Sequence, residues 1–399
     1  MPSQLDHVYE RLYAYCEQRG FAGHDPFDGL NSHVFQMTPL KRSRLARLAW
    51  LQTLKRLPLN LRPALRIPEG VNPKAIALFA LAELSRLRAT GDTDHAENAG
   101  ELLEILSATS IKSTTPAGGT AAGYGYNFDW QSRAFYAPRG TAAVVPTAFA
   151  CRAIVEAYGA FRDDSLLNAA DEICAFILTC LNRPVDDGDE ISFSYTPLDN
   201  SVVYNASLLA GESLAAVGQL TQNSKYLKIA SRAARFVIKR QRADGAWVYG
   251  AAGKQQWVDN FHTAYVLLSL NRIADAIPDM GDETAGPLKA GIDYWLDNFF
   301  LQDGTPKYYA NKLYPIDIHS PAAAIAVMSE LRTLDPRLLP MARKVAEWTV
   351  HNMLDERGFF YYQLRRGRIV KTPFMRWGQA WMAYALARLI EAEAIAAPG

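Results

Sequence analysis

Five apolar segments recur along the chain at nearly constant intervals. They begin at residues 146, 205, 262, 319 and 378, so successive starts lie 57 or 59 residues apart, and a sixth such segment begins at residue 72. Alanine, glycine, serine and leucine occupy these segments on nearly all sides, which is typical of helices that are buried in every direction. The period predicts a repeat architecture in which each unit packs on the next.

Longer segments of a second kind alternate with the buried ones. They carry charge on one helical face, which predicts an outer layer of amphipathic helices, and they span residues 40–57, 97–109, 165–181, 224–241, 285–301 and 336–354. Six inner and six outer helices predict an all-α fold, the (α/α)6 toroid, because closing the ring removes the exposed ends of the repeat. No Pro/Ser-rich linker divides the chain, so we expect one domain over residues 1–399. In it, residues 1–35 supply an extra N-terminal cap helix (3–19) and a lid loop.

The connections before the inner helices are also regular. They combine Asp-Gly turns with alternating aromatic residues, a pattern that predicts short hairpins, and they span residues 124–145, 186–204, 242–261, 302–318 and 355–377. Because each precedes an inner helix, all of them should lie on one face of the ring. We therefore expect a cavity mouth there, rimmed by tyrosine and tryptophan.

Two of these connections end on the same pair of residues. "WVDNFHTAYVLLSL" begins at residue 257 and "YPIDIHSPAAAIAVM" at residue 314, and each places an Asp shortly before a His at the start of an inner helix. One interpretation is capping of the helix, since Asp259 and Asp317 would favour the helix dipole. The other is chemistry at the cavity mouth, with both aspartates as acid and base and with His262 and His319 as assistants.

Further polar and aromatic residues are predicted at the same level. Arg376 and Trp377 suit a sugar that carries a carboxylate, because a guanidinium grips the anion at two points while an indole stacks on the ring. The polar loop "GHDPFDGLNS" (23–32) could fold across the mouth, although Asx-turn chemistry would explain its composition equally well. The complete set of predicted substrate-binding residues is Asp25, Asp28, Asp129, Tyr204, Asn205, Trp247, Tyr308, Arg376 and Trp377.

The composition of the chain and the motifs that it lacks reduce the range of possible functions. Lys plus Arg is 42 and Asp plus Glu is 41, so the whole chain has no charge excess that would indicate nucleic acid or an anionic membrane. The four cysteines form no CxxC pair and are expected to be reduced. The first residues have no signal-peptide pattern, so a cytoplasmic protein without membrane insertion is expected. No P-loop, dinucleotide fingerprint, G-x-S-x-G or zinc spacing is present, which predicts no cofactor and no metal.

Several motifs resemble those of known families. "QRADGAWVYG" (241–250) resembles the packing repeat of squalene–hopene cyclases and protein prenyltransferases, but it occurs once and the cyclase D-x-D-D motif is absent. The overall pattern resembles the six-hairpin glycosidase-like toroids. "GHDPFDGLNS", "DNFHTAYVL", "YPIDIHSPA" and "FMRWGQAWM" are similar to bacterial proteins from exopolysaccharide gene clusters, which are labelled prenyltransferase-like. The resemblance implies a toroid fold and a setting in polysaccharide metabolism.

The sequence therefore predicts a carbohydrate-active enzyme that binds an oligosaccharide or polysaccharide. Hydrolysis by paired Asp residues is the first interpretation, because glycoside hydrolysis requires two carboxyl groups. Elimination or epimerisation of a uronic acid by His or Tyr is the second. A third interpretation is a non-catalytic glycan-binding scaffold, and a fourth is an isoprenoid-binding toroid, which would need a mouth without carboxylates. The sugar, the linkage and the oligomeric state are left open.

Overall fold

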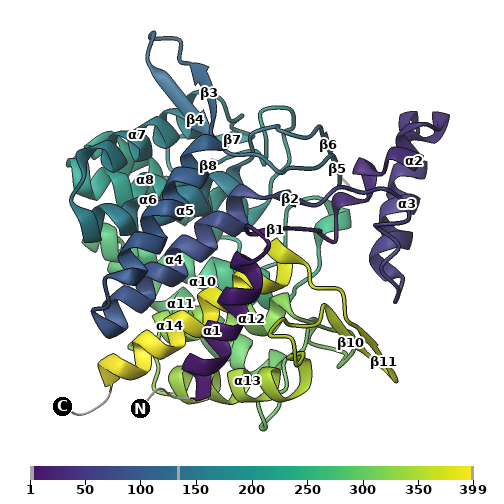
Figure 1. The fold of residues 1–399 in the computed structure, drawn as a ribbon. Helices are drawn as coiled ribbons and strands as arrows, with labels where there is room; N and C mark the ends of the chain where they lie inside the picture. The colour runs from purple at the N-terminus through teal and green to yellow at the C-terminus, as the bar shows by residue number, and fades with distance from the viewer. Residues whose placement is uncertain (1–3, 133–134, 397–399) are drawn as a thin grey trace.

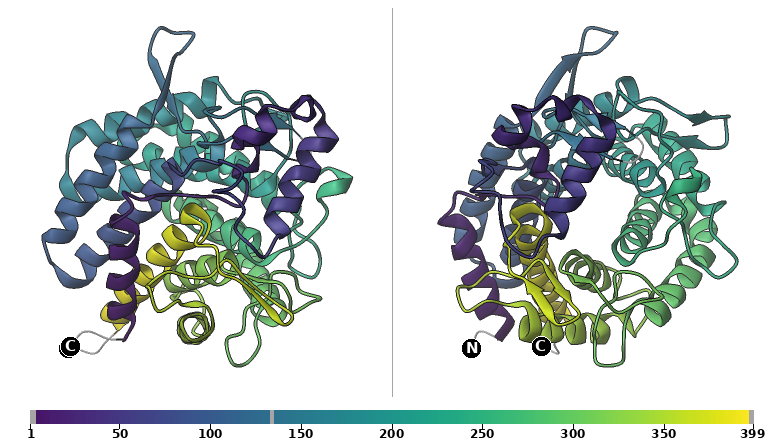
Figure 2. Two further views of the ribbon diagram at one scale, coloured as in Figure 1. Left: turned by 45° about the vertical axis from the view of Figure 1, so that its right-hand side comes forward. Right: turned by 90° about the vertical axis from the view of Figure 1, so that its right-hand side faces the viewer.

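The inner layer of the structure is a ring of helices. The structure is a computed structural model that describes residues 4–132 and 135–396. The inner helices are α4 (Pro73–Thr90), α6 (Val144–Phe161), α8 (Tyr204–Thr221), α10 (Asn260–Ala276), α12 (His319–Glu330) and α14 (Ala380–Ala396). Helix α14 follows a π-helical turn, η5 (Met375–Gln379), and packs against α4, so the ring closes (Figure 2, right). The six predicted inner helices and the toroid are confirmed.

Amphipathic helices surround this ring. They are α1 (Gln4–Glu17), α5 (Asp94–Ala108), α7 (Asp164–Thr179), α9 (Ser224–Ile238), α11 (Gly281–Phe299) and α13 (Leu338–Met353). Each outer helix buries one face only; α9, for example, buries seven residues that follow a helical stripe. Five of them coincide with predicted amphipathic segments.

The sixth outer helix is α1, whereas the segment 40–57 lies elsewhere. Helix α1 packs against α14, and it is bonded to α4 through Tyr9 with Glu83 and through Asp6 with Arg86. The expectation that 3–19 caps the ring and that 40–57 joins the outer layer was wrong. The physical reason is burial. Helix α3 (Arg44–Arg56) buries only Leu51 and Leu54, and two residues form too narrow an apolar stripe to pack against the inner helices.

Helix α3 instead lies at one side of the mouth of the ring (Figure 2, right). Together with η1 (Asp28–Asn31), α2 (His33–Gln36) and η2 (Pro39–Arg42), it projects from the ring on that side (Figure 1). With the mouth facing the viewer, the segment lies in front of the ring (Figure 2, right). The polar loop 23–32 leads into it.

All strands are short and lie in the connections. Four antiparallel pairs are β1 (Ala22–Gly23) with β2 (Gly70–Val71), β3 (Ile111–Thr114) with β4 (Thr120–Gly123), β5 (Trp130–Gln131) with β6 (Tyr136–Ala137), and β7 (Val185–Asp186) with β8 (Ile191–Ser192). A three-stranded sheet has the order β11 (Arg368–Val370), β10 (Gln363–Arg365), β9 (Ile316–Asp317). Short 3-10 turns, η3 (Gly253–Gln255) and η4 (Pro278–Met280), complete the connections. The predicted hairpins are therefore present in the loops before α6, α8 and α14.

The turn at Asp244-Gly245 requires glycine for two reasons. Gly245 has φ +89°, in the region that side chains rarely adopt, and a Cβ there would lie 2.3 Å from the carbonyl oxygen of Ala290 on α11. We expect Gly245→Ala to lower the free energy of unfolding by about 2–4 kcal/mol, measured by urea denaturation. Gly188→Ala is the matched control, because Gly188 has φ +93° but open space around its Cβ position. A loss of about 1 kcal/mol is expected there; equal losses would contradict the steric argument.

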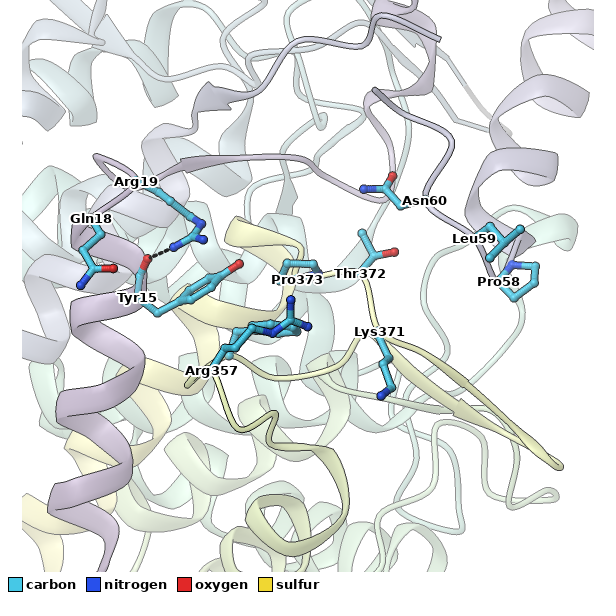
Figure 3. A pocket seen from close by; sticks show the side chains of 11 residues that line it. Tyr15, Gln18, Arg19, Pro58, Leu59, Asn60, Arg357, Lys371, Thr372 and Pro373 are labelled. Atoms are coloured by element: carbon cyan, nitrogen blue, oxygen red, sulfur yellow. Dashed lines mark hydrogen bonds between the residues drawn. The ribbon is translucent and has the colours of Figure 1, made fainter. Parts of the chain in front are cut away.

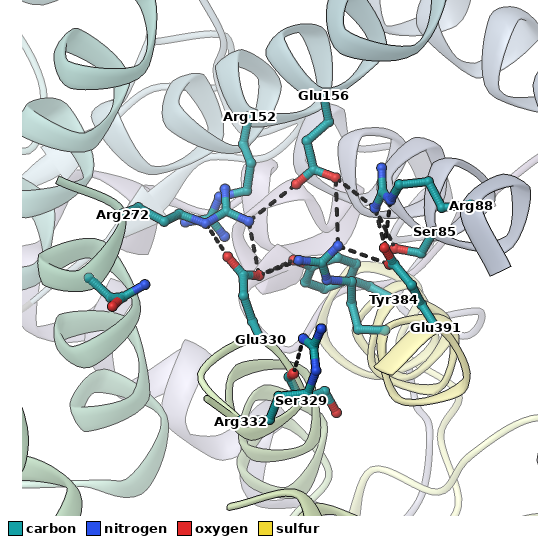
Figure 4. Close-up of polar contacts among 12 residues, drawn as sticks. Ser85, Arg88, Arg152, Glu156, Arg272, Ser329, Glu330, Arg332, Tyr384 and Glu391 are labelled. Atoms are coloured by element: carbon teal, nitrogen blue, oxygen red, sulfur yellow. Dashed lines mark hydrogen bonds and ion pairs between the residues drawn. The ribbon is translucent and has the colours of Figure 1, made fainter. Parts of the chain in front are cut away.

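Below the mouth, charged side chains fill the axis of the ring. They extend from the middle of the inner helices toward their C-terminal ends. Figure 4 shows those from α4, α6, α10, α12 and α14, and Glu212 contributes from α8. Arg152 on α6 donates two hydrogen bonds to Glu212 on α8, of 2.9 and 2.8 Å. Arg272 on α10 donates two to Glu330 on α12, of 2.5 and 2.9 Å, and one to Glu156.

The same network continues to the helices that close the ring. Arg88 on α4 donates to Glu391 on α14 at 2.6 Å and to Glu156 at 3.1 Å. Arg388 on α14 donates to Glu330 at 2.8 Å. These alternating charges form a floor under the cavity, and we call them the charged floor.

Among the described residues, one helix is long and apolar enough to span a membrane by length and composition. It is α6, with a mean hydropathy of 1.2 over 18 residues, and 67% of it is buried inside the protein. Its position in the inner ring accounts for its apolar composition. The four cysteines, all within the described residues, are unpaired.

Candidate active site

A cavity of about 600 Å³ opens at the mouth of the ring. Its walls come from the first turns of the inner helices and from the connections before them, and α3 borders its opening. Thirteen of its lining residues are aromatic: Phe27, Tyr126, Phe128, Trp130, Phe135, Tyr195, Tyr249, Trp257, Phe261, Tyr265, Tyr308, Tyr309 and Trp377. Such a lining provides faces on which the C–H surfaces of sugar rings can stack. The predicted aromatic mouth is thus present.

The charged residues of this cavity are mainly basic. Its lining contains Lys55, Arg56, Lys74, Lys312 and Arg376, but among the described residues only one acidic side chain, Asp259. Close approach of several cations in a partly enclosed space favours an anionic ligand. No group of three or more His, Cys, Asp or Glu side chains within 4–132 and 135–396 is arranged to hold a metal ion.

Asp259 is bonded to His262 across the first turn of α10. Its Oδ1 accepts a hydrogen bond from the His262 backbone N–H at 3.0 Å, which caps the helix, and its Oδ2 lies 2.7 Å from His262 Nδ1. The indole of Trp257 also donates to Oδ2, at 2.9 Å. Asp259 is 1% exposed and both of its oxygens are engaged. The carboxylate therefore holds the imidazole by Nδ1, which leaves Nε2 on the opposite side of a ring that lines the cavity.

His319 lies deeper and is part of a hydrogen-bonded chain. Its Nδ1 lies 3.0 Å from the carbonyl oxygen of Trp377, which can only accept, so Nδ1 carries a proton. Its Nε2 lies 2.7 Å from the hydroxyl of Tyr265, and Lys74 Nζ lies 3.4 Å from the same hydroxyl. Burial, and then Lys74, lower the pKa of His319 well below its usual value, while burial raises the pKa of Tyr265. A neutral His319 thus accepts from Tyr265 and donates to Trp377.

Lys74 ends this chain in an aromatic enclosure. Its Nζ lies 4.1 Å from the ring centre of Phe149 and 5.2 Å from those of Tyr265 and Trp381, and the residue is 3% exposed. Burial lowers the pKa of Lys74 well below its usual value, and Arg376 lowers it further. The cavity wall therefore presents an amine that loses its proton more easily than an ordinary lysine.

The state of His319 predicts a dependence of stability on pH. Its folded-state pKa lies below the unfolded value of 6.5, so its contribution is complete above that pH. The contribution is lost as the pH falls below 6.5, by up to about 1.4 kcal/mol per pH unit. Urea denaturation at several pH values should show this decline in the unaltered protein, and a smaller one in His319→Gln. An identical decline in both would contradict the assignment.

Asp317 is fully hydrogen-bonded and does not line the cavity. Its Oδ1 accepts from the Trp377 indole at 2.7 Å and from the His319 backbone N–H at 3.1 Å, and its Oδ2 accepts from Gln363 at 2.6 Å. Burial raises the pKa of Asp317, while Lys55 opposes that shift. It borders a neighbouring groove of about 520 Å³ that shares Lys55, Arg56 and Lys312 with the cavity. These bonds favour a role in orienting Trp377 and α12; the catalytic assignment of Asp259 and Asp317 stays a prediction.

Arg376 lines the cavity, but its guanidinium is already paired. Nε and Nη2 donate to the carboxylate of Asp25 at 2.6 and 2.9 Å, and both residues are buried. Asp28 in turn accepts from Arg62 at 2.7 Å. Asp25 and Asp28 thus fix loop 23–32 against η5 and residue 62, and neither lines the cavity.

The remaining predicted residues divide between the cavity and the core. Asn205, Tyr308 and Trp377 line the cavity, and the Oδ1 of the buried Asn205 has no hydrogen-bond partner among the described residues. Trp247 donates its indole N–H to Val237 in the core. Asp129 accepts from the backbone N–H of Arg139 in a loop. Neither these two nor Tyr204 lines the cavity.

Sequence reasoning missed several residues of the cavity, of which three bear on its chemistry. They are Lys55 on α3, Tyr265 one turn after His262, and Lys74. A signal for Lys74 was present, because "NPKAIALFAL" places a lone cation in the first turn of an otherwise apolar inner helix. Lys74, His262 and His319 all lie in the first turn of an inner helix.

A second hollow, of about 470 Å³, lies beside the ring (Figure 3). It is bordered by the C-terminal end of α1, residues 58–60 and residues 371–373, and Arg19 donates there to the carbonyl of Tyr15 at 2.9 Å. Arg19, Arg357 and Lys371 give it a basic lining, with no His, Asp or Glu among the described lining residues. It therefore lacks a pair of groups for acid–base chemistry.

A double ring of helices with a cavity at the inner N-termini is the (α/α)6 toroid architecture. Solved structures with this arrangement include a cellobiose 2-epimerase from Bacillus thermoamylovorans, with TM-score 0.62, 12% identity, and coverage of 82% of this chain and 88% of that one. A GH76 alpha-mannanase from Bacteroides thetaiotaomicron gives TM-score 0.60, 14% identity and coverage of 81% and 87%. An unsaturated glucuronyl hydrolase specific for heparin gives TM-score 0.60 and 12% identity, with coverage of 98% of this chain and 96% of that one.

At these identities the likeness concerns the fold. No family model matches the sequence, and no curated protein matches it significantly. The resemblance to toroid enzymes seen in the sequence is confirmed at the level of architecture, whereas the link to exopolysaccharide clusters stays a prediction.

Proposed function

We propose that this protein is a carbohydrate-active enzyme that performs acid–base chemistry on an acidic sugar, by epimerisation or elimination, with His262 as the base. The observation that carries the proposal is the Asp259–His262 pair in a cation-rich, aromatic cavity. The same side chain, Asp259, is the only acidic residue among the described residues that line it.

Such chemistry removes a proton from a carbon next to a carbonyl or carboxylate. It requires a base within reach of that carbon and fixed positive charge where negative charge develops on oxygen. His262 Nε2 would take the proton while Asp259 stabilises the resulting imidazolium. The imidazolium would then return a proton to the carbon in epimerisation, or give it to the departing oxygen in elimination. Lys55, Arg56 and Lys312 bring positive charge to the cavity.

Hydrolysis by Asp259 and Asp317, the first interpretation of the sequence, is less well supported. Glycoside hydrolysis requires two carboxyl groups that flank the bond, of which one must protonate the leaving group or activate water. Each aspartate accepts three hydrogen bonds from protein donors, and Asp317 borders the neighbouring groove. The known structures of this fold include both epimerases and hydrolases, so the reaction must be measured directly.

One experiment distinguishes the reactions. The purified protein is incubated with matched acidic and neutral oligosaccharides in heavy water or in water labelled with heavy oxygen, and products are followed by mass spectrometry. Deuterium uptake without cleavage would indicate epimerisation, and an unsaturated end would indicate elimination. Heavy oxygen in a shortened product would indicate hydrolysis and overturn the proposal, as would turnover of neutral sugars alone. Binding of acidic sugars without any product would favour the non-catalytic scaffold.

A further inference from the structure

A basic segment of the chain lies at the mouth of the ring. Residues 33–68, which we call the mouth segment, contain eight Lys and Arg residues and no Asp or Glu. The chain as a whole has 42 basic and 41 acidic residues, so the remainder of it is net acidic. Five of the eight cations are exposed, namely Lys41, Arg42, Arg44, Arg56 and Arg66, whereas Arg62 is buried and paired with Asp28. The near-zero total charge therefore conceals a local concentration of positive charge.

The mouth segment also exposes large apolar side chains. Met37 is 87% exposed, Leu45 78%, Leu59 71% and Leu40 53%. Met37, Leu40 and Leu45 belong to one tip, because η2 packs against both α2 and α3. Lys41, Arg42 and Arg44, all exposed, separate these apolar residues along the chain, so leucine side chains and cations are interleaved on one surface.

The exposed face of α3 connects this tip to the cavity. Leu45, Ala49, Gln52 and Arg56 are exposed and recur at helical spacing, so they share one face of α3. Gln52 and Arg56 also line the cavity and the neighbouring groove. The face that begins at the apolar tip therefore ends at the opening of the cavity.

We infer that the mouth segment docks this protein on the surface of an anionic lipid membrane, with the cavity opening next to the lipid headgroups. Basic helices with exposed leucines bind such surfaces through two additive contributions, insertion of apolar side chains and attraction of Lys and Arg to anionic lipids. Nucleic acid would be recognised by the cations alone and gives no role to Met37, Leu40 and Leu45. The inference is independent of the reaction at His262.

The test is co-sedimentation of the full chain with vesicles of phosphatidylcholine, with and without phosphatidylglycerol, near physiological salt. Binding is expected to the anionic vesicles and should weaken at high salt. Lys41→Gln with Arg42→Gln should lower the affinity roughly 10- to 30-fold. The matched control is Lys225→Gln with Lys228→Gln, which removes two exposed cations from α9 on the outer layer and should leave binding unchanged.

The apolar contribution is tested separately. Leu40→Ser with Leu45→Ser should also weaken binding, whereas Leu198→Ser with Leu334→Ser, at sites 63% and 45% exposed, should not. Equal loss in the test and control variants would overturn the inference, as would equal binding to vesicles without phosphatidylglycerol. Absence of vesicle binding would also overturn it, even if the chain were retained by RNA or by an acidic protein. Circular dichroism of each variant ensures that lost binding is not lost folding.

Discussion

Replacement of His262 by alanine is expected to lower kcat about 10²- to 10⁴-fold, the usual contribution of a positioned general base. The limb of the pH–rate profile that reports this base should disappear. His262 lies at the cavity wall with its side chain 20% exposed, so the fold should be retained. Steady-state kinetics against pH, with the acidic sugar that gives turnover, measures both effects. His351→Ala, which removes an exposed imidazole from α13, is the matched control and should leave kcat unchanged.

A second substitution at the same pair separates the two interpretations of the site. Asp259→Asn keeps an oxygen that can cap α10, but it removes the anion that holds His262 Nδ1 and stabilises the imidazolium. If Asp259 positions His262, its loss should cost no more than the loss of His262 itself, and the double variant should resemble His262→Ala. If Asp259 were the reacting acid, as the sequence first suggested, Asp259→Asn would be the more damaging change and His262→Ala would keep most of the activity.

A large effect on stability is expected at the charged floor. Glu330 accepts hydrogen bonds from Arg272 and Arg388, and only 14% of its side chain is exposed. Glu330→Gln would remove the anion that these two half-buried guanidinium groups share, although Glu156, Glu212 and Glu391 stay as partners. The free energy of unfolding should fall by about 2–4 kcal/mol. Denaturant unfolding at neutral pH measures this loss. Asp293→Asn removes a carboxylate from exposed pairs with Lys289 and Arg337, and should cost less than about 1 kcal/mol.

The pH dependence of the same residue gives an independent check. Burial opposes ionisation of Glu330, but Arg272 and Arg388 outweigh it and lower the pKa of this carboxyl below its ordinary value of 4.5. The folded state therefore holds the anion more firmly than the unfolded state does. Its contribution is complete above about pH 4.5 and is lost as the pH falls below that value. Glu330→Gln should thus lose less stability on acidification than the unaltered protein, and an equal loss would contradict the argument.

The repeat architecture could be predicted because the inner helices are apolar on all sides. Each apolar segment can be recognised from its own composition, without knowledge of its partners. Because the segments recur at regular intervals, His262 and His319 could be placed at the same level of one ring. The exchange between residues 3–19 and 40–57 could not be predicted in this way. Both segments are amphipathic, and the choice depends on partners distant in sequence, such as Glu83 and Arg86 on α4, which bond to α1.

The positions of the charged residues could be predicted from the sequence more readily than their roles. Asp259 and Asp317 were predicted near the mouth, but the donors that engage them, Trp257, Gln363 and Trp377, follow from tertiary packing. Arg376 was predicted at the mouth, but its pairing with Asp25 joins residues 351 positions apart. Lys74 was missed because a lysine after a proline at a helix start is ordinarily solvated, and only the closed ring surrounds it with aromatic side chains.

The charged floor has a consequence for how any polymer could be processed. Side chains from all six inner helices bond to one another across the axis, so the ring is a cup with one entrance. A glycan cannot thread through it and slide forward between successive turnovers. Any ligand of the cavity must therefore enter and leave through the same opening at the mouth.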